Sequence, residues 1–363
     1  MIFMENFKIL LIKYRNIGDV ILSSCLVDNL KLNYPKSTID YATNKECYEA
    51  ISLNPNINKI YLYDRKKIRN NMIARLFDFY QTVSCVRQKK YDLIINLTEG
   101  DHGAYISLFS KAKIRLGFPP RKGFLSKINL FNKIGDDKTW QPTVLKDLQF
   151  INLLGKDVKT KKTSFYFSED DAYFVKKLLQ ENNIRRFVLI HPVSRWMFKC
   201  WEDDRMAKVI DYLIFEKSID VVITCSKAST EQERVRNILK KCRSKPLVLF
   251  GVLNLKQLGA LIKRSEFFFG VDSAPMHIAA AINKTILALF GASYPALWGP
   301  WSNENNDSFF EDKNGLQTNG KHLIISNMDH RIFYEFGVKK TKGMVKIVLS
   351  DVKNAIDLIM KDK

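Results

Sequence analysis

The feature that most constrains the fold of this 363-residue sequence is an alternation of short apolar segments with longer segments of helical periodicity, which occurs twice along the chain. Strands that alternate with helices form mostly parallel sheets, because each helix carries the chain back across the sheet. The fold class predicted is therefore α/β, with two Rossmann-like domains. The apolar segments are residues 7–13, 39–42, 60–63 and 91–97 in the first half, and 187–190, 221–224, 247–250, 267–271 and 285–290 in the second.

Length also favours two domains, since 363 residues exceed what one hydrophobic core usually supports. Residues 136–171 are rich in Lys, Asp and Thr and are interpreted as the inter-domain region. We therefore predict an N-terminal domain over residues 1–168 and a C-terminal domain over 169–345. Apolar residues recur at helical spacing near the end of the chain, which predicts a closing helix within 346–363.

A basic charge excess limits the class of partner. The sequence has 58 Lys and Arg against 38 Asp and Glu, a formal net charge of +20. Such an excess favours an anionic partner, or else keeps the protein soluble through solvated lysine faces. No nucleic-acid-recognition pattern is present, so no nucleic-acid partner is expected, whereas an anionic membrane surface or a phosphorylated lipid headgroup suits the charge. Basic positions in the first half include 65, 66, 67, 69, 75, 111, 113, 115, 121, 122 and 127.

Cysteine usage and the chain's first residues indicate a cytosolic protein. The six cysteines form no CxxC pair and have no close histidine partner, which is typical of reduced thiols. Residues 1–7 carry no basic leader and run directly into a predicted strand, so no signal peptide is expected. No run of 18 uncharged apolar residues occurs, so we expect no membrane-spanning helix.

The segment 267–282 predicts a ligand site, because an apolar strand becomes a helix there. Asp272, Ser273 and Ala274 lie at that junction, and His277 follows one turn later. The first amides of a helix have no intrahelical acceptor and attract anions, and ligands of open α/β sheets bind at the carboxyl ends of the strands. The alternative is an ordinary capped helix with a buried, hydrogen-bonded histidine.

Two further loops follow predicted strands. Residues 13–19 combine Lys13 and Arg15 with Asp19 at a glycine turn, and residues 191–199 contain His191, Ser194 and Lys199. Neither half has a G-x-G-x-x-G fingerprint after its first strand, which disfavours an NAD-dependent oxidoreductase. No Walker A motif or metal-ligand spacing is present, so no metal is expected.

With these three loops, the chain resembles glycosyltransferase family 9, the ADP-heptose:lipopolysaccharide heptosyltransferases, from end to end. The D-S-A-P form and the W-G-P-W ending most resemble the heptosyltransferase III branch. Four segments carry the resemblance, in the family's order: KILLIKYRNIGDVILSSCLVDNLKLNYPKSTID at 8–40, HPVSRWMFKCW at 191–201, VDSAPMHIAAA at 271–281 and LALFGASYPALWGPW at 287–301.

The resemblance implies a GT-B fold with an acceptor-binding N-domain, a nucleotide-sugar-binding C-domain and a cleft between them. It also implies inverting transfer from an ADP-sugar, with no metal or other cofactor. Asp19 matches the family's proposed catalytic base, which would take a proton from the acceptor hydroxyl; the structural alternative is a helix N-cap. Lys13 and Arg15 would hold acceptor carboxylates or phosphates, or else form a solvated turn.

On the donor side, the resemblance assigns each matched residue a partner on the nucleotide sugar. Lys199 would act in catalysis by stabilising the leaving diphosphate, with Ser194 beside it. Asp272 would bond a sugar hydroxyl, because two anions repel. The backbone amides of Ser273 and Ala274 would bind a phosphate, and His277 would complete that site. Glu231 would bind the ribose; the alternatives are that Glu233 does so, or that Glu231 is a plain helix-start carboxylate. Leu253 would lie against the adenine.

Two residues and one loop complete the candidate site. Asp101 and His102 follow the strand 91–97 and are candidates for acceptor binding. The loop 195–198, Arg-Trp-Met-Phe, departs from the family pattern; its aromatic rings either cover the sugar or pack the loop.

The function predicted is transfer of heptose from ADP-L-glycero-D-manno-heptose to a Kdo-lipid A-type inner core of lipopolysaccharide. The enzyme would be cytoplasmic and peripheral on the cytoplasmic face of the inner membrane, where its positive charge meets an anionic surface. The alternatives are a GT-B transferase that uses another nucleotide sugar, an NAD-dependent oxidoreductase, and a non-catalytic nucleotide-binding module. No particular oligomeric state is predicted.

Overall fold

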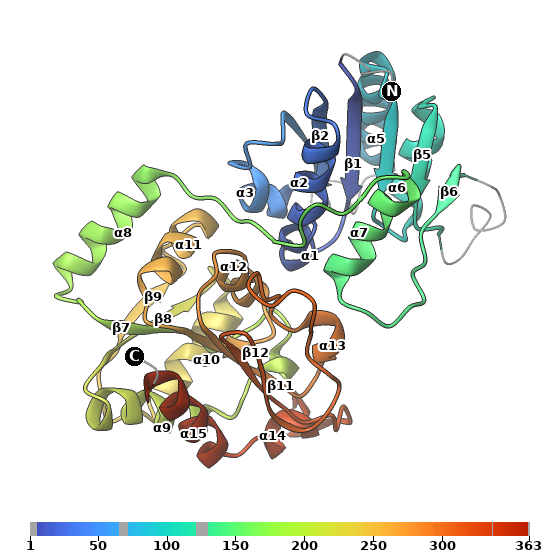
Figure 1. The fold of residues 1–363 in the computed structure, drawn as a ribbon. Helices are drawn as coiled ribbons and strands as arrows, with labels where there is room; N and C mark the ends of the chain where they lie inside the picture. Colours follow the sequence, from blue (N-terminus) through green and yellow to red (C-terminus); the bar gives the residue numbers. More distant parts are fainter. Residues whose placement is uncertain (1–5, 65–71, 121–129, 336, 362–363) are drawn as a thin grey trace. The chain divides into compact units, whose positions relative to one another are not determined.

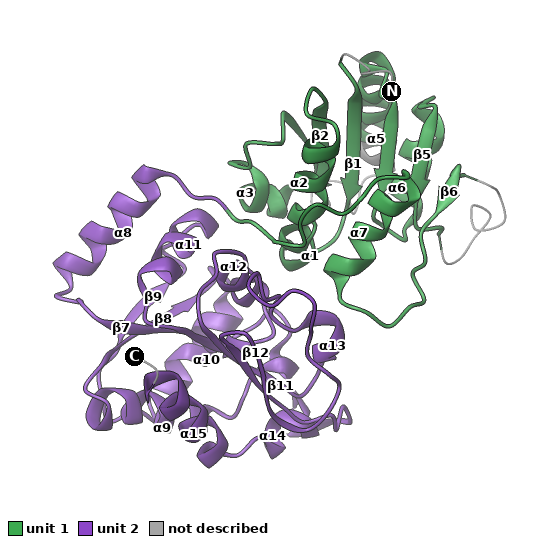
Figure 2. Cartoon of the chain, viewed as in Figure 1, with its two compact units in different colours: residues 1–165 green, residues 166–363 purple. Residues whose placement is uncertain are grey.

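A computed structural model of the chain describes residues 6–64, 72–120, 130–335 and 337–361. The chain divides into two compact units, residues 1–165 and 166–363 (Figure 2). The division falls three residues before the boundary predicted at 168, and the segment 346–363 belongs to the second unit. Each unit is described by itself below.

Unit 1 is built on a six-stranded parallel sheet with the order β3-β2-β1-β4-β5-β6. Figure 1 labels β2, β1, β5 and β6 of this sheet. The central strands β1 and β4 have continuous apolar interiors, Ile9–Ile12 and Leu93–Ile95, as expected for strands that are covered on both faces. The strands are β1 (Lys8–Lys13), β2 (Thr38–Asn44), β3 (Lys59–Tyr63), β4 (Leu93–Asn96), β5 (Ile114–Gly117) and β6 (Lys133–Ile134).

The helices of unit 1 follow the strands in alternation, as the sequence predicts, with one correction. Residues 143–153, within the predicted inter-domain region, form a helix of unit 1 whose apolar residues, such as Val144 and Leu148, are buried. The prediction failed because the Lys and Asp around this helix conceal its apolar face. The helices are α1 (Ile17–Leu22), α2 (Ser24–Asn33), α3 (Tyr48–Ile51), α5 (Met72–Lys89), α6 (Asp101–Phe109) and α7 (Thr143–Leu153), with a 3-10 turn at Lys45–Cys47.

Unit 2 contains a seven-stranded sheet with the order β12-β13-β11-β10-β7-β8-β9, parallel except for the antiparallel pair β12 and β13. The sequence predicted β7 to β11 and missed β12 and β13. The strands are β7 (Phe187–His191), β8 (Asp220–Cys225), β9 (Leu247–Phe250), β10 (Phe268–Val271), β11 (Ile286–Phe290), β12 (Gly315–Asn319) and β13 (His322–Ser326), with a separate hairpin of β14 (Ile332–Glu335) and β15 (Val338–Thr341).

The predicted closing helix is α15 (Leu349–Lys361), and a short helix, α14 (Lys342–Lys346), precedes it. The helical structure is interrupted at Ile347, between α14 and α15. The carbonyl oxygen of Ile347 accepts hydrogen bonds from Trp201 Nε1 at 3.0 Å and Arg205 Nη1 at 2.5 Å. The helices of unit 2 are α8 (Glu169–Glu181), α9 (Asp203–Asp211, continued by a π turn at Tyr212–Glu216), α10 (Ser229–Leu239), α11 (Leu255–Arg264), α12 (Ala274–Ala281), α13 (Pro295–Trp298), α14 (Lys342–Lys346) and α15 (Leu349–Lys361), with a 3-10 turn at Met197–Lys199.

Apart from the antiparallel edge strand β12, the strand order of each sheet reverses once, and this reversal positions the candidate site. β1 lies between β2 and β4, and β7 lies between β8 and β10. Ligands of open α/β sheets bind beyond the carboxyl ends of the strands at such a reversal. Gly270 permits the close pairing of β10 with β7, because a Cβ at this position would lie 2.8 Å from the carbonyl oxygen of His191.

Candidate active site

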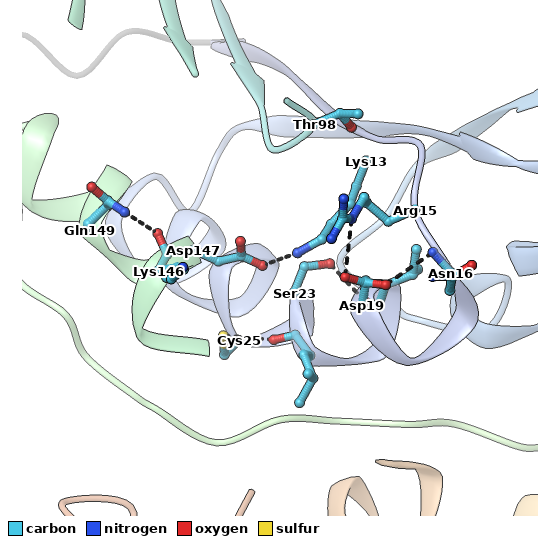
Figure 3. Close-up of polar contacts among 12 residues, drawn as sticks. Lys13, Arg15, Asn16, Asp19, Ser23, Cys25, Thr98, Lys146, Asp147 and Gln149 are labelled. Carbon is cyan, nitrogen blue, oxygen red and sulfur yellow. Dashed lines mark hydrogen bonds and ion pairs between the residues drawn. The ribbon is translucent and has the colours of Figure 1, made fainter. Parts of the chain in front are cut away.

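The turn after β1 holds Asp19 by reciprocal bonding at the start of α1 (Figure 3). Asp19 Oδ2 accepts a hydrogen bond from the backbone amide of Asn16 at 3.1 Å, and Oδ1 accepts one from Arg15 Nε at 3.4 Å. Asn16 is the N-cap, so the alternative that Asp19 is itself the N-cap is wrong; it is the third residue of a capping box. The carboxylate is 5% exposed and is therefore held in one orientation.

Lys13 lies at the end of β1, but its ammonium group is buried. Its Nζ lies 2.5 Å from Asp147 Oδ2 of α7, and both side chains are 2% exposed (Figure 3). The alternative of a solvated turn is therefore wrong for Lys13, whereas Arg15 is 39% exposed. Burial raises the pKa of Asp147, and the neighbouring Lys13 ammonium opposes that rise. Contact of Lys13 with an acceptor stays a prediction.

Asp101 and His102 stand beyond β4, the neighbour of β1. Asp101 is exposed at the first residue of α6, and the ring of His102 stacks on Tyr63 with centroids 4.3 Å apart. The His102 ring also contacts Tyr14, which follows Lys13, at 4.9 Å. Adjacent strand ends therefore bring the predicted acceptor residues to one edge of the unit 1 sheet.

The carboxyl edge of the unit 2 sheet brings Lys199 and Asp272 into contact. Lys199 ends a 3-10 turn in the loop after β7, and its Nζ lies 2.5 Å from Asp272 Oδ2. The same oxygen accepts a hydrogen bond from Ser293 Oγ at 2.6 Å. Lys199 is 20% exposed and Asp272 8%, so the pair is accessible at one side.

Ser293 is a residue that the sequence reasoning left unassigned. It follows β11 in the segment 287–301, so its place after a strand was visible in the sequence. Its bond to Asp272, 21 residues away, was not.

The start of α12 lies beside this pair. Ser273 occupies the N-cap position without a side-chain capping bond, and its Oγ has no hydrogen-bond partner within the described part of the chain. Ala274 begins the helix, Pro275 follows it, and His277 is 4% exposed. The first-turn amides of a helix have no intrahelical acceptor, so this end of α12 can bind an anion.

The other predicted donor residues line the same sheet edge. Ser194 is buried, and its Oγ accepts a hydrogen bond from the amide of Trp196 at 3.3 Å. Glu231 is 6% exposed in the first turn of α10 and accepts a hydrogen bond from the Ser226 amide at 2.9 Å, whereas its alternative, Glu233, is exposed. Leu253 is half-buried between β9 and α11.

His191 joins two strands of the unit 2 sheet. Its Nδ1 lies 3.0 Å from Thr224 Oγ1, which ties the end of β7 to β8. Burial lowers the pKa of His191 to about 4, although the neighbouring Glu231 carboxylate raises it. The ring is therefore neutral at physiological pH. In the loop beyond it, Trp196 is 53% exposed and lies 6.0 Å from the Phe198 ring.

Within residues 6–64, 72–120, 130–335 and 337–361, no group of three or more His, Cys, Asp or Glu side chains is arranged to hold a metal ion. The edge of unit 2 offers a cation, a carboxylate and helix amides, which can bind a phosphorylated sugar. The edge of unit 1 offers the Asp19 carboxylate, which can accept a proton from a hydroxyl group.

Comparison with known proteins identifies the family. The sequence model of glycosyltransferase family 9 (heptosyltransferase) matches residues 80–321. The chain belongs to glycosyltransferase family 9. It is 31% identical to lipopolysaccharide heptosyltransferase 3 of Escherichia coli over 296 residues, 79% of this chain and 84% of the relative. It is 26% identical to the lipopolysaccharide core heptosyltransferase OpsX of Haemophilus influenzae over 306 residues, 84% and 85% of the two chains.

Solved structures share the fold of this transferase. A family 9 glycosyl transferase from Veillonella parvula superposes with a TM-score of 0.82 at 21% identity, covering 99% of this chain and 98% of the other. E. coli ADP-heptose lps heptosyltransferase II gives 0.74 at 21% identity, with 98% and 99% covered. The predicted family, its heptosyltransferase III branch, the GT-B fold and the enzyme class are confirmed. The chain is thus a glycosyltransferase, and the alternatives of an oxidoreductase and a non-catalytic module are wrong.

The buried pair makes a prediction about stability. Asp147→Ala leaves the Lys13 ammonium buried without its carboxylate, which we expect to lower the free energy of unfolding by about 3–5 kcal/mol. Urea denaturation followed by circular dichroism measures the loss. The double variant Lys13→Met/Asp147→Leu removes both charges and should recover most of it.

The matched control is the exposed pair Lys159 and Asp157, whose side chains are 50% and 91% exposed. Asp157→Ala should cost less than about 1 kcal/mol. Equal losses for Asp147→Ala and Asp157→Ala would contradict the structural role of the buried pair.

His191 predicts an acid-sensitive stability. Its folded pKa of about 4 lies below the unfolded value of about 6.5, so the unfolded chain binds more protons between these two values. The contribution of His191 is complete above about pH 6.5 and falls as the pH drops toward 4, by up to about 3 kcal/mol. Thermal unfolding from pH 7.5 to 4.5 should show a smaller slope in His191→Asn, whose amide does not titrate. A slope unchanged from the parent chain would refute this assignment.

Proposed function

We propose that this transferase moves heptose from ADP-L-glycero-D-manno-heptose to the inner core of lipopolysaccharide, in one inverting step without a metal. The observation that carries the proposal is the Lys199–Asp272–Ser293 cluster beside the start of α12. It combines a partly exposed cation, a carboxylate and helix amides, as a sugar diphosphate requires. The names of the relatives support the heptose and the lipopolysaccharide acceptor.

In unit 2, each group has a task on the donor. The Lys199 ammonium and the amides of Ser273 and Ala274 neutralise the diphosphate as the glycosidic bond breaks and negative charge grows on the leaving ADP. Asp272 has accepting capacity left after its two bonds and takes a hydrogen bond from a sugar hydroxyl. His277 completes the phosphate site and Ser194 adds a hydroxyl. Glu231 binds the ribose and Leu253 lies against the adenine.

In unit 1, Asp19 accepts the proton. The acceptor hydroxyl oxygen attacks the anomeric carbon from the face opposite ADP, its bond to carbon forms as the bond to phosphate oxygen breaks, and its proton passes to Asp19. Arg15 and the Asn16 amide hold the carboxylate in place for this step. The sugars and acidic groups of the acceptor are bound by Arg15, Asp101 and His102. Lys13 stabilises the turn that carries Asp19 through its buried ion pair with Asp147.

We further propose that the enzyme works as a peripheral protein on the cytoplasmic face of the inner membrane. The described residues include no helix long and apolar enough to cross a membrane. Several basic positions that the sequence suggested for the anion-facing surface, 65, 66, 67, 69, 121, 122 and 127, lie outside the described residues, as does the side chain of Arg75.

The test is a transfer assay with purified protein, ADP-heptose and a heptose-deficient core acceptor. We expect an acceptor mass increase of one heptose with release of one ADP. Asp19→Asn, which keeps hydrogen-bonding groups but is a poor base, should lower kcat by about 10²–10⁴-fold and leave ADP affinity unchanged. Lys199→Met should lower kcat by about 10²–10³-fold and also weaken ADP binding.

Glu233→Gln is the matched control, because Glu233 is the exposed neighbour of Glu231 on α10. Its kcat and ADP affinity should equal those of the parent chain, whereas Glu231→Gln should weaken ADP binding. Absence of both heptose transfer and ADP release would refute the proposed function. Full activity of Asp19→Asn would remove its role as the base.

A further inference from the structure

Helix α5 of unit 1 exposes an apolar stripe. Ile73, Leu76, Phe77 and Tyr80 recur at the spacing i, i+3, i+4, i+7, which places them on one face of the helix. Their exposed fractions are 80%, 62%, 60% and 71%. Single exposed apolar side chains are common, but four on one helical face mark a surface that binds a partner.

The neighbouring helix α6 extends this surface. Its Tyr105 and Phe109 are 38% and 44% exposed and stack on each other, with ring centroids 6.3 Å apart. Phe79, on the inner side of α5, contacts both rings at 6.1 and 6.2 Å. We call the four exposed residues of α5 together with Tyr105 and Phe109 the α5–α6 patch.

Cations accompany the patch, and acidic residues are scarce. Arg87 and Lys89 are exposed in the last turn of α5, and Lys111 and Lys113 are exposed just after Phe109. Asp78 is the one acidic residue of α5, and it is half-buried. Residues 1–165 as a whole contain 28 Lys and Arg against 15 Asp and Glu. Apolar and aromatic side chains next to basic ones are typical of helices that lie in the interface of an anionic bilayer.

We propose that the α5–α6 patch docks this chain on an anionic membrane, with its apolar side chains in the headgroup region and the four cations on the lipid phosphates. The inference deepens the proposed function, because the acceptor proposed there is a membrane lipid. It assigns the membrane contact to particular residues that have no part in the transfer site.

The alternative occupant is a second copy of the chain. A self-interface at this patch would bring the same cations of two copies together. α5 exposes no acidic side chain to balance them, and the exposed Asp101 of α6 lies at the opposite end of that helix from Phe109. A bilayer containing phosphatidylglycerol supplies the missing negative charge. Charge complementarity therefore favours the membrane.

The experiment measures binding of the full-length chain to vesicles by co-sedimentation. Phosphatidylcholine vesicles with and without phosphatidylglycerol separate the electrostatic from the apolar contribution. We expect binding to the anionic vesicles that weakens with added salt, and at least about tenfold weaker binding for Leu76→Ser/Phe77→Ser. Lys111→Gln/Lys113→Gln should weaken binding to anionic vesicles by about fivefold for each cation removed.

The matched control is Tyr173→Ser/Phe174→Ser, which removes two exposed large side chains from α8 of unit 2, where the first turn carries three acidic residues. Its vesicle binding should stay within about twofold of the parent chain. A second variant, Ile73→Ser/Tyr80→Ser, samples the two ends of the same stripe. Circular dichroism verifies that each variant is folded.

Four outcomes decide the proposal. Loss of binding in both stripe variants and retention in the α8 control support it. Failure of the parent chain to bind anionic vesicles overturns it. Binding of both stripe variants as tight as that of the parent chain also overturns it. A dimer in sedimentation velocity that the stripe variants dissociate, with vesicle binding unchanged, assigns the patch to a self-interface and also overturns it.

Transfer to a water-soluble core oligosaccharide separates this proposal from the proposed function. The stripe variants should transfer heptose to it at the parent rate, because the stripe takes no part in the transfer site. No transfer by the parent chain would refute the proposed function, whereas normal transfer without vesicle binding would refute membrane docking alone.

Discussion

Parallel strands end together at one edge of a sheet, and both candidate sites depend on this geometric constraint. In unit 2 this edge collects Ser194 and Lys199 after β7, Glu231 after β8, Asp272 after β10 and Ser293 after β11. The edge brings residues that are 73 positions apart within 2.5 Å, as Lys199 and Asp272 show. The proposed donor site is a consequence of strand order more than of any single motif.

Two ion pairs of equal length illustrate how burial separates a ligand site from a structural one. Lys199 and Asp272 lie 2.5 Å apart with side chains 20% and 8% exposed, so a phosphate can approach the ammonium. Lys13 and Asp147 lie equally close but are both 2% exposed, so their charges compensate each other within the protein. A buried charge needs its partner far more than an exposed one does. We therefore place Lys199 on the substrate and Lys13 under the turn that carries Asp19.

Much of the fold could be predicted from the sequence. β7 to β11 are apolar segments separated by helical periodicity, and each of their observed bounds lies within one residue of the predicted one. β12 escaped prediction because it is an edge strand of mostly polar residues, Gly-Leu-Gln-Thr-Asn, with no apolar run. α7 escaped because Lys146 and Asp147 interrupt its apolar face, and polar composition was read as a linker.

The candidate site, like the fold, could be predicted from the sequence only in part. Asp19, Lys199 and Asp272 follow predicted strands, so their positions at the sheet edges could be derived from local pattern. The Lys13–Asp147 pair joins residues 134 positions apart, and no local signal in one sequence links two such residues. The aromatic contacts of His102 with Tyr14 and Tyr63 arise likewise from packing across neighbouring strands.

The proposed reaction is a direct displacement, in which the acceptor oxygen attacks the donor's anomeric carbon with Asp19 as the base. NMR on product made by chelator-treated protein determines the anomeric configuration of the newly formed heptosyl bond. A direct displacement without a metal yields a configuration opposite to that of the ADP-linked donor, formed at an undiminished rate. Retention of the donor's configuration, or loss of transfer on chelation that a divalent metal restores, would contradict it.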